Sequence, residues 1–90
     1  MSIELFILNY NFSGDIMKYN ERIRELREDN DFNQSQIAEI LNVGQKTYSD
    51  YELGKTRIPI DSIIKLAKHY NVSVDYICGV SNIKNEYPKK

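Results

Sequence analysis

The sequence predicts an all-α domain of five short helices, and three observations favour this class. Apolar residues recur at helical spacing in several segments between residues 18 and 79. Asn, Gly and Ser stand at the ends of these segments, where they cap helices. Short connections suit a chain of 90 residues, which can bury only a modest core. We therefore expect one helix-turn-helix domain (18–80) between an N-terminal extension (1–17) and a polar, frayed C-terminal tail (81–90).

The composition excludes several classes of function. Cys78 is the only cysteine and His69 the only histidine, so an internal disulfide and a Cys- or His-based metal site are both ruled out. No pattern of catalytic residues is present, and we expect no enzyme activity, no metal and no cofactor. The formal net charge is -1, whereas a DNA-binding domain is expected to be basic. Local placement of charge must therefore support any role on DNA.

Residues 1–17 differ in character from the rest of the chain. The run from Ile3 to Leu8 is apolar but contains Glu4, lacks a basic leader, and is too short for a signal peptide or a membrane span. We expect a cytoplasmic protein with no membrane contact. A helical pattern begins directly after Met17, which suggests that the functional domain starts there and that residues 1–17 are an extension or an upstream translation start. The alternative is a short strand or loose segment that packs on the domain or on a second chain.

The first helix is predicted at residues 20–29, with Asn20 as its N-cap. Tyr19, Ile23 and Leu26 lie on one face at helical spacing. Most of the charged residues around them form a solvated face, and Arg27 flanks the apolar stripe.

The second helix begins after Asn33 and ends at Asn42. Phe32 and Ile37 have the spacing of a hydrophobic staple, and Asn33 with Gln36 has that of a capping box. Asn42 tolerates the left-handed conformation that ends a helix. Residues 42–44 then form a tight turn, as a helix-turn-helix requires.

The third helix begins after Gly44 and ends at Gly54, and its two faces differ in chemistry. Tyr48 and Tyr51 point toward the core. An arc of roughly 140° on the other side carries mostly polar residues, namely Gln45, Lys46, Ser49, Asp50 and Leu53.

Two further helices complete the domain. Pro59 prevents helix until the fourth segment, whose apolar stripe consists of Ile60, Ile63, Ile64, Ala67 and Tyr70. A last short helix begins after Ser73 and ends at Gly79.

The polar arc of the third helix suits the major groove of DNA. Gln bonds adenine bidentately, Lys donates to guanine, and Asp accepts from the cytosine amino group. Gln45, Lys46 and Asp50 supply these three types. An ordinary solvated helix face is the alternative interpretation of the same residues. The two capped helices and the aromatic inner face favour DNA.

Residues 18–79 resemble the Cro/phage-repressor helix-turn-helix family, also called the xenobiotic-response-element type. The resemblance rests on an ordered set: Arg27, Gln34, Ala38, Asn42-Val43, Glu52, Gly54, Pro59 and the LAKHYNVSVDYI stretch. It implies a sequence-specific regulator of transcription, by family habit a repressor, that binds a double-stranded DNA operator.

The resemblance also implies roles for individual residues. Base reading falls to Gln45, Lys46 and Asp50, with Ser49 beside them. Contacts to the DNA backbone fall to Gln34 with the neighbouring Asn33, and to Lys55 and Arg57 in the following loop. Arg27 and Glu52 match a structural ion pair that ties the first helix to the end of the third.

Three positions depart from the family pattern. Gly44 replaces a hydroxyl N-cap, Tyr48 replaces a small aliphatic residue, and Leu53 stands where a polar residue is common. Leu53, the ambiguous Asp50 and the acidic balance support a second interpretation, a protein-interaction module such as an antitoxin or anti-repressor.

A homodimer is the expected assembly. One short helix reads few bases, and paired half-sites about 34 Å apart supply the missing affinity. We expect the contact at the last helix and tail, where Val80, Ile83 and Tyr87 are spare apolar groups.

Overall fold

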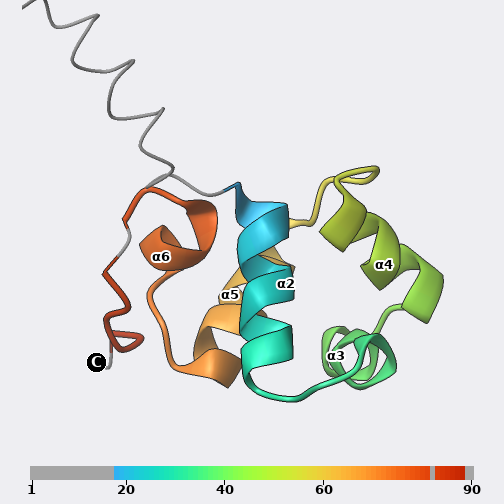
Figure 1. The fold of residues 1–90 in the computed structure, drawn as a ribbon, viewed down its shortest axis with the longest axis horizontal. Helices are drawn as coiled ribbons and strands as arrows, with labels where there is room; N and C mark the ends of the chain where they lie inside the picture. The colour runs from blue at the N-terminus through green and yellow to red at the C-terminus, as the bar shows by residue number, and fades with distance from the viewer. Residues whose placement is uncertain (1–17, 82, 89–90) are drawn as a thin grey trace, which may run out of the picture.

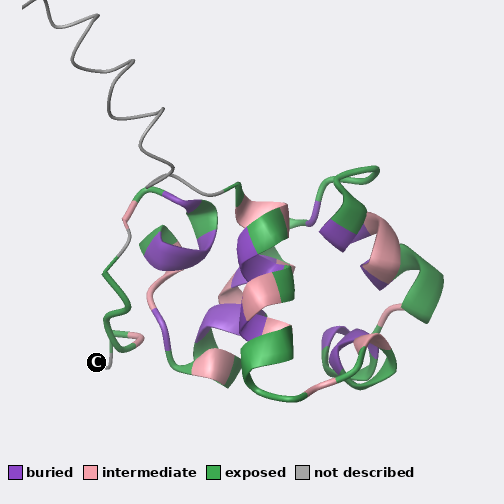
Figure 2. Cartoon of the chain, viewed as in Figure 1, coloured by how far each residue is buried: buried purple, intermediate pink, exposed green. Residues whose placement is uncertain are grey.

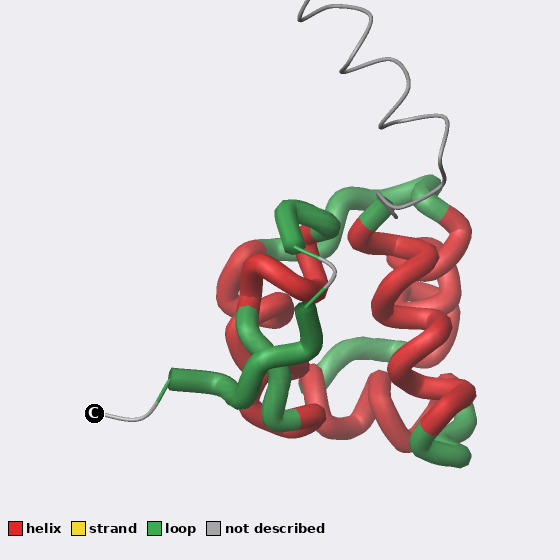
Figure 3. Tube along the Cα trace, turned by 60° about the vertical axis from the view of Figure 1, so that its left-hand side comes forward, coloured by secondary structure: helices red, strands yellow, loops and turns green. Residues whose placement is uncertain are grey.

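The computed structural model describes residues 18–81 and 83–88, and this part of the chain contains helices and no strand (Figures 1 and 3). The helices are α2 (Tyr19–Asp29), α3 (Gln34–Leu41), α4 (Gln45–Leu53), α5 (Ile60–Tyr70) and α6 (Val74–Cys78). The prediction of an all-α fold with a helix-turn-helix at its second and third helices is confirmed. The expectations for residues 1–17 lie outside the described residues.

Helices α2 and α5 connect the α3–α4 pair with α6. α2 packs against both α4 and α6, and α5 packs against both α3 and α6. The pair α3–α4 therefore lies to one side of α2, with α6 on the other side (Figure 1). This arrangement leaves the outer edge of α4 uncovered, as its exposed residues in Figure 2 show.

The core contains side chains from all five helices. Ile23, Ile37, Tyr48, Leu66 and Ile77 have no exposed surface. In Figure 2 the buried residues lie on the sides of the helices that face one another. Removing each buried Ile or Leu side chain from water contributes about 1.5–3 kcal/mol to the free energy of folding.

The buried face of α5 differs from the predicted stripe. Ile60 is 60% exposed, whereas Leu66, absent from that stripe, is completely buried. Ile60 is the first residue of α5 and lies before the turn that meets the core. The face that packs on α3 and α6 contains Ile63, Leu66 and Ala67, so it is rotated from the predicted one.

The predicted cap of the first helix is wrong. α2 begins at Tyr19 with Lys18 as N-cap, and Lys18 makes no side-chain cap hydrogen bond. Asn20 lies inside the helix, where its Nδ2 donates to the main-chain oxygen of Glu52 at 3.2 Å. The amide of Asn20 thus ties α2 to the end of α4 instead of capping its own helix.

The caps of the helix-turn-helix agree with the prediction. The Asn33 side chain accepts from the Gln36 N–H at 2.8 Å, and the Gln36 side chain accepts from the Asn33 N–H at 2.9 Å. Asn42 and Gly54 end α3 and α4 in the left-handed conformation, with φ of 59° and 74°. Gly44 caps α4 without a side-chain hydrogen bond. The N-terminus of α3 is therefore better stabilised than that of α4, because Gly44 lacks the hydroxyl that usually caps the third helix in the family.

The charged face of α2 is not solvated throughout. Arg22 is only 5% exposed and forms an ion pair with Glu25 at 3.2 Å. Its guanidinium carbon lies 3.9 Å from the ring centroid of Tyr76, a cation–π contact. α6 packs on α2 and covers Arg22, which a helical pattern of charges cannot reveal.

The described tail residues 83–88 fold back on the domain instead of fraying. The Ser73 N–H donates to the Asn85 oxygen at 2.9 Å, and the Tyr87 N–H donates to Asn71 Oδ1 at 3.3 Å. Lys68 lies over the half-buried ring of Tyr87, 5.7 Å from its centroid. Tyr87 is therefore engaged within its own chain.

Candidate nucleic-acid interface

α4 presents a polar surface on a rigid aromatic base. Gln45 and Lys46 are exposed, and Ser49 and Asp50 are half-buried. On the opposite side Tyr48 is completely buried and Tyr51 is 5% exposed, with their rings 6.3 Å apart in an edge arrangement. Because both rings are fixed by packing, the N-terminal turn of α4 is held in place with its polar groups toward solvent.

Lys46 and Asp50 interact across one helical turn. Lys46 Nζ lies 3.5 Å from Asp50 Oδ2, and their side chains are 90% and 21% exposed. The main-chain oxygen of Asp50 accepts from the Lys55 and Thr56 N–H groups at 2.9 and 3.3 Å, which ends the helix. The Asp50 carboxylate is thus partly neutralised by a neighbour that remains free to reach a ligand.

The start of α3 turns two adjacent side chains in different directions. Gln34 Nε2 donates to Glu52 Oε1 at 3.1 Å, toward the interior. Ser35 Oγ donates to Gln45 Oε1 at 2.9 Å and so joins the N-terminal turns of α3 and α4 at the surface. An amide nitrogen carries two hydrogens, so Gln34 keeps one N–H for a further acceptor. Asn33 Oδ1 accepts in the capping box, and its amide nitrogen remains a donor.

Ser35 is a residue that the sequence reasoning missed. Its only signal was a hydroxyl next to Gln34 at the start of a helix. The register between α3 and α4, which brings it to Gln45, required the structure.

Arg27 and Glu52 form the ion pair that the resemblance implies. Arg27 Nε lies 2.7 Å from Glu52 Oε2, and Arg27 Nη2 lies 3.1 Å from Glu52 Oε1. Arg27 Nη1 also donates to the Phe32 oxygen at 2.9 Å. One guanidinium of α2 therefore ties the residue before Asn33 to the last turn of α4.

The electrostatics of this pair follow from its burial and its hydrogen bonds. Burial by itself raises the pKa of Glu52, but the hydrogen bonds from Arg27 and Gln34, together with the nearby polar hydroxyl of Tyr48, outweigh it, so the pKa lies below its usual value. The hydrogen bond to Glu52 raises the pKa of Arg27. Burial raises the pKa of Tyr48, and Glu52 raises it further. Within the described residues the buried Tyr48 hydroxyl has no hydrogen-bond partner. Glu52 and Arg27 are both ionised at neutral pH.

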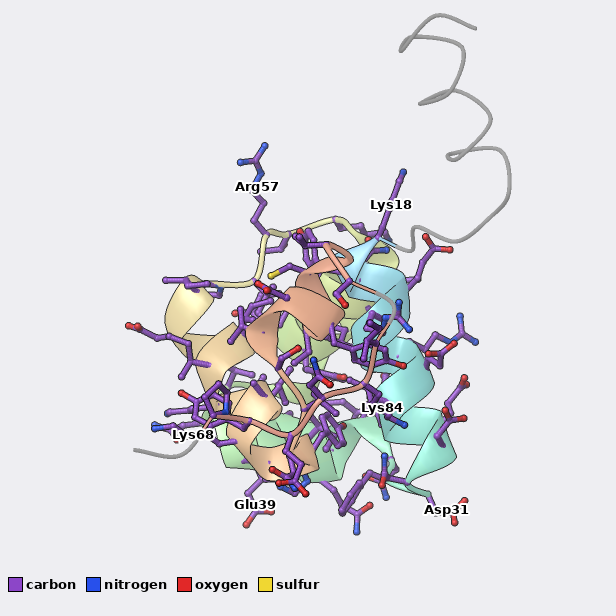
Figure 4. The ribbon with its side chains drawn as sticks, turned by 90° about the vertical axis from the view of Figure 1, so that its left-hand side faces the viewer. Lys18, Asp31, Glu39, Arg57, Lys68 and Lys84 are labelled. Atoms are coloured by element: carbon purple, nitrogen blue, oxygen red, sulfur yellow. The ribbon has the colours of Figure 1, made fainter. Side chains whose placement is uncertain are left out.

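Basic side chains gather where α4 ends. Lys55 and Arg57 are exposed in the loop between α4 and α5. Figure 4 shows Arg57 and Lys18 projecting from one end of the molecule, with Glu39 and Asp31 at the opposite end. Basic side chains therefore lie at this end of the molecule although its net charge is small and negative. Lys18 was not predicted as part of this basic end, because it precedes the helical pattern.

A shallow groove lies beside this basic end. It has a volume of about 630 Å³ and is lined by Lys18, Leu53, Arg57, Ile60 and neighbouring residues. Leu53 and Ile60 are 57% and 60% exposed. The groove is thus an apolar surface with two cations on its rim.

The described residues offer little for other chemistry. Among residues 18–81 and 83–88, no group of three or more His, Cys, Asp or Glu side chains is arranged to hold a metal ion. No helix in the same part of the chain has both the length and the apolar character to cross a membrane.

A capped helix-turn-helix that exposes amide and ammonium groups at the start of its second helix has the architecture of a DNA-binding domain. The chain belongs to the helix-turn-helix family of Cro/C1 type, whose family model matches residues 23–77.

Named relatives agree with this assignment. The regulator ImmR of Bacillus subtilis is 36% identical over 74 residues, which cover 82% of this chain and 55% of ImmR. YobD of Bacillus subtilis, an uncharacterised HTH-type transcriptional regulator, is 36% identical over 64 residues, covering 71% of this chain and 57% of YobD. The cryptic phage CTXphi repressor RstR of Vibrio cholerae is 38% identical over 56 residues, covering 62% of this chain and 50% of RstR. The chain thus spans a little over half the length of these relatives.

A solved structure supports the fold directly. The crystal structure of a transcriptional regulator from Listeria innocua matches with a TM-score of 0.68 and 31% identity. The match covers 77% of this chain and 65% of that chain.

Proposed function

We propose that the protein is a sequence-specific regulator of transcription, a repressor, that binds a double-stranded DNA operator in the cytoplasm. The observation that carries the proposal is the exposed N-terminal turn of α4, with Gln45 and Lys46 facing solvent above a packed aromatic base. The names of the relatives, which include a phage repressor, give it further support.

We assign base reading to the outer face of α4. Lys46 donates to guanine acceptors, Gln45 bonds adenine, and Asp50 accepts from a cytosine amino group, with Ser49 beside them. The Lys46–Asp50 pair keeps Asp50 from repelling the DNA before a base replaces Lys46 as its partner.

Contacts to the phosphates come from both ends of this face. Lys55 and Arg57 approach the backbone from the loop after α4. Asn33 and Gln34 approach it from the start of α3, each with an amide N–H left over from its internal hydrogen bond. Positioning contacts of this kind carry affinity but no sequence information.

Selection of bound sites from a random DNA pool tests the proposal. A recovered motif with half-sites about 34 Å apart is expected for a helix-turn-helix dimer. Affinity for that motif should fall steeply with salt, because phosphate contacts release counterions. Recovery of random sequences, or an affinity that does not change with salt, contradicts DNA recognition. It would instead favour a protein-interaction module such as an antitoxin or anti-repressor, which the names of the relatives do not support.

We further propose that the protein acts as a homodimer through its C-terminal surface. Val80 and Ile83 are 75% and 66% exposed there, whereas Tyr87 packs on its own chain. Sedimentation of a Val80→Asp/Ile83→Asp variant should show a monomer. Ile60→Asp is the matched control, since Ile60 is exposed to a similar degree in the groove beside Arg57. Dissociation by the control alone would assign the dimer contact to that groove.

A further inference from the structure

The two helices of the helix-turn-helix are connected at the surface by one side-chain hydrogen bond. Ser35, the second residue of α3, donates from Oγ to Oε1 of Gln45, the first residue of α4, at 2.9 Å. We propose that Ser35 is a positioning residue for base recognition, whose hydroxyl holds the Gln45 amide in its reading conformation. This inference rests on the proposed function, in which Gln45 contacts a base.

The neighbouring side chains explain why this role falls to Ser35. Gln34 precedes it but is turned inward, with its Nε2 on Glu52 Oε1 at 3.1 Å. Asn33 and Gln36 hydrogen-bond each other in the capping box. Of these four polar residues at the start of α3, Ser35 is the one hydrogen-bonded to Gln45.

An exposed glutamine gains from such a partner. Its side chain has several rotatable bonds, and ordering it against a base costs conformational entropy. A hydrogen bond that already holds the amide in the free protein removes part of this cost before binding. The same bond strengthens when DNA displaces the surrounding water, because the local dielectric constant falls.

The bond also determines which atoms of Gln45 are left for DNA. Ser35 uses one of the two lone pairs of Oε1, and both hydrogens of Nε2 remain. With Oε1 held toward α3, the remaining acceptor and donor form a pair that matches the amino group and N7 of adenine. Ser35 thus leaves Gln45 with the acceptor and the donor that a bidentate contact to adenine requires.

Affinity measurements on single-base variants of the selected site test the inference. Fluorescence anisotropy would compare the wild type, Ser35→Ala, Ser35→Thr, Gln45→Ala and the double alanine variant. Ser35→Ala removes one neutral hydrogen bond, so it should reduce the preference for the selected base over the other bases at the Gln45 base pair by about two- to tenfold. Other base pairs and the salt slope should not change. Ser35→Thr, which keeps a hydroxyl, should preserve discrimination, and Ser35→Ala should have no effect at that base pair once Gln45 is alanine.

Two results would overturn the inference while leaving the proposed function intact. In one, Ser35→Ala weakens every sequence by the same factor, as loss of a phosphate contact would. In the other, its effect persists in the Gln45→Ala background. If the wild type selects no motif, or if Gln45→Ala leaves base preference unchanged, the assignment of Gln45 fails, and the role of Ser35 fails with it. Ser35 is exposed, so an unchanged melting curve by circular dichroism is expected for Ser35→Ala and separates these outcomes from misfolding.

Discussion

Replacing Glu52 with Gln should destabilise the domain strongly without changing its shape. The Glu52 side chain is 2% exposed and that of Arg27 13% exposed, so the pair is nearly removed from water. Gln is isosteric, but its amide nitrogen meets the N–H groups of Arg27 and leaves a cation without its partner. Breaking a buried ion pair from one side costs about 3–5 kcal/mol. Arg27 keeps its bond to the Phe32 oxygen, so we expect the lower limit, about 3 kcal/mol.

Urea unfolding followed by circular dichroism measures this loss. For a domain of this size about 3 kcal/mol corresponds to a melting temperature lower by about 12–24 °C. The exposed Glu39→Gln is the control and should stay within about 0.5 kcal/mol of the wild type.

The pH dependence gives an independent check. The folded pKa of Glu52 lies below the unfolded value of about 4.3, so its stabilisation is complete above that value and is lost as pH falls through the folded pKa. The stability difference between wild type and Glu52→Gln should therefore be constant from pH 7 to about pH 5 and shrink below about pH 4. A difference that stays constant into acid, or no difference at pH 7, would refute the argument.

Four other substitutions test the interface and the core. Lys46→Ala should cost about 1–3 kcal/mol on the selected site and relax one base position, as read by anisotropy on single-base variants. Arg57→Ala should weaken binding to all DNA sequences alike and lower the slope of log affinity against log salt concentration by about one unit. If Lys46→Ala and Arg57→Ala behaved in the same way, the division into base readers and phosphate anchors would be wrong. Leu66→Ala should lower the free energy of unfolding by about 2–5 kcal/mol, because Leu66 is completely buried. Ile60→Ala should change it little, and a larger loss for Ile60→Ala than for Leu66→Ala would support the apolar stripe expected from the sequence.

Local signals predicted most of the fold. The capping box at Asn33 and the left-handed ends at Asn42 and Gly54 depend on residues within a few positions of each other, so the sequence alone located them. The assignment of Asn20 as a cap failed, and the burial of Arg22 was missed, for the opposite reason. Each makes its decisive contact with a residue more than 30 positions away, at Glu52 and at Tyr76.

The candidate site divides in the same way. The outward arc of α4 follows from helical periodicity, so Gln45 and Lys46 could be located from sequence. The bond from Ser35 to Gln45, the inward turn of Gln34 and the position of Lys18 near Arg57 depend on how helices are placed relative to each other. The resemblance to a family supplied the Arg27–Glu52 pairing, which periodicity alone does not indicate.

The contacts of Arg27 with the residue before α3's cap and with the end of α4 have a consequence for the proposed DNA partner. A reading unit locked by a buried ion pair has little freedom to adapt when it docks. The duplex must then supply the adjustment by bending or by changing its groove width, at a cost that depends on its sequence. Base pairs that no side chain touches, between the two half-sites of a dimer, would then contribute to operator choice through their stiffness.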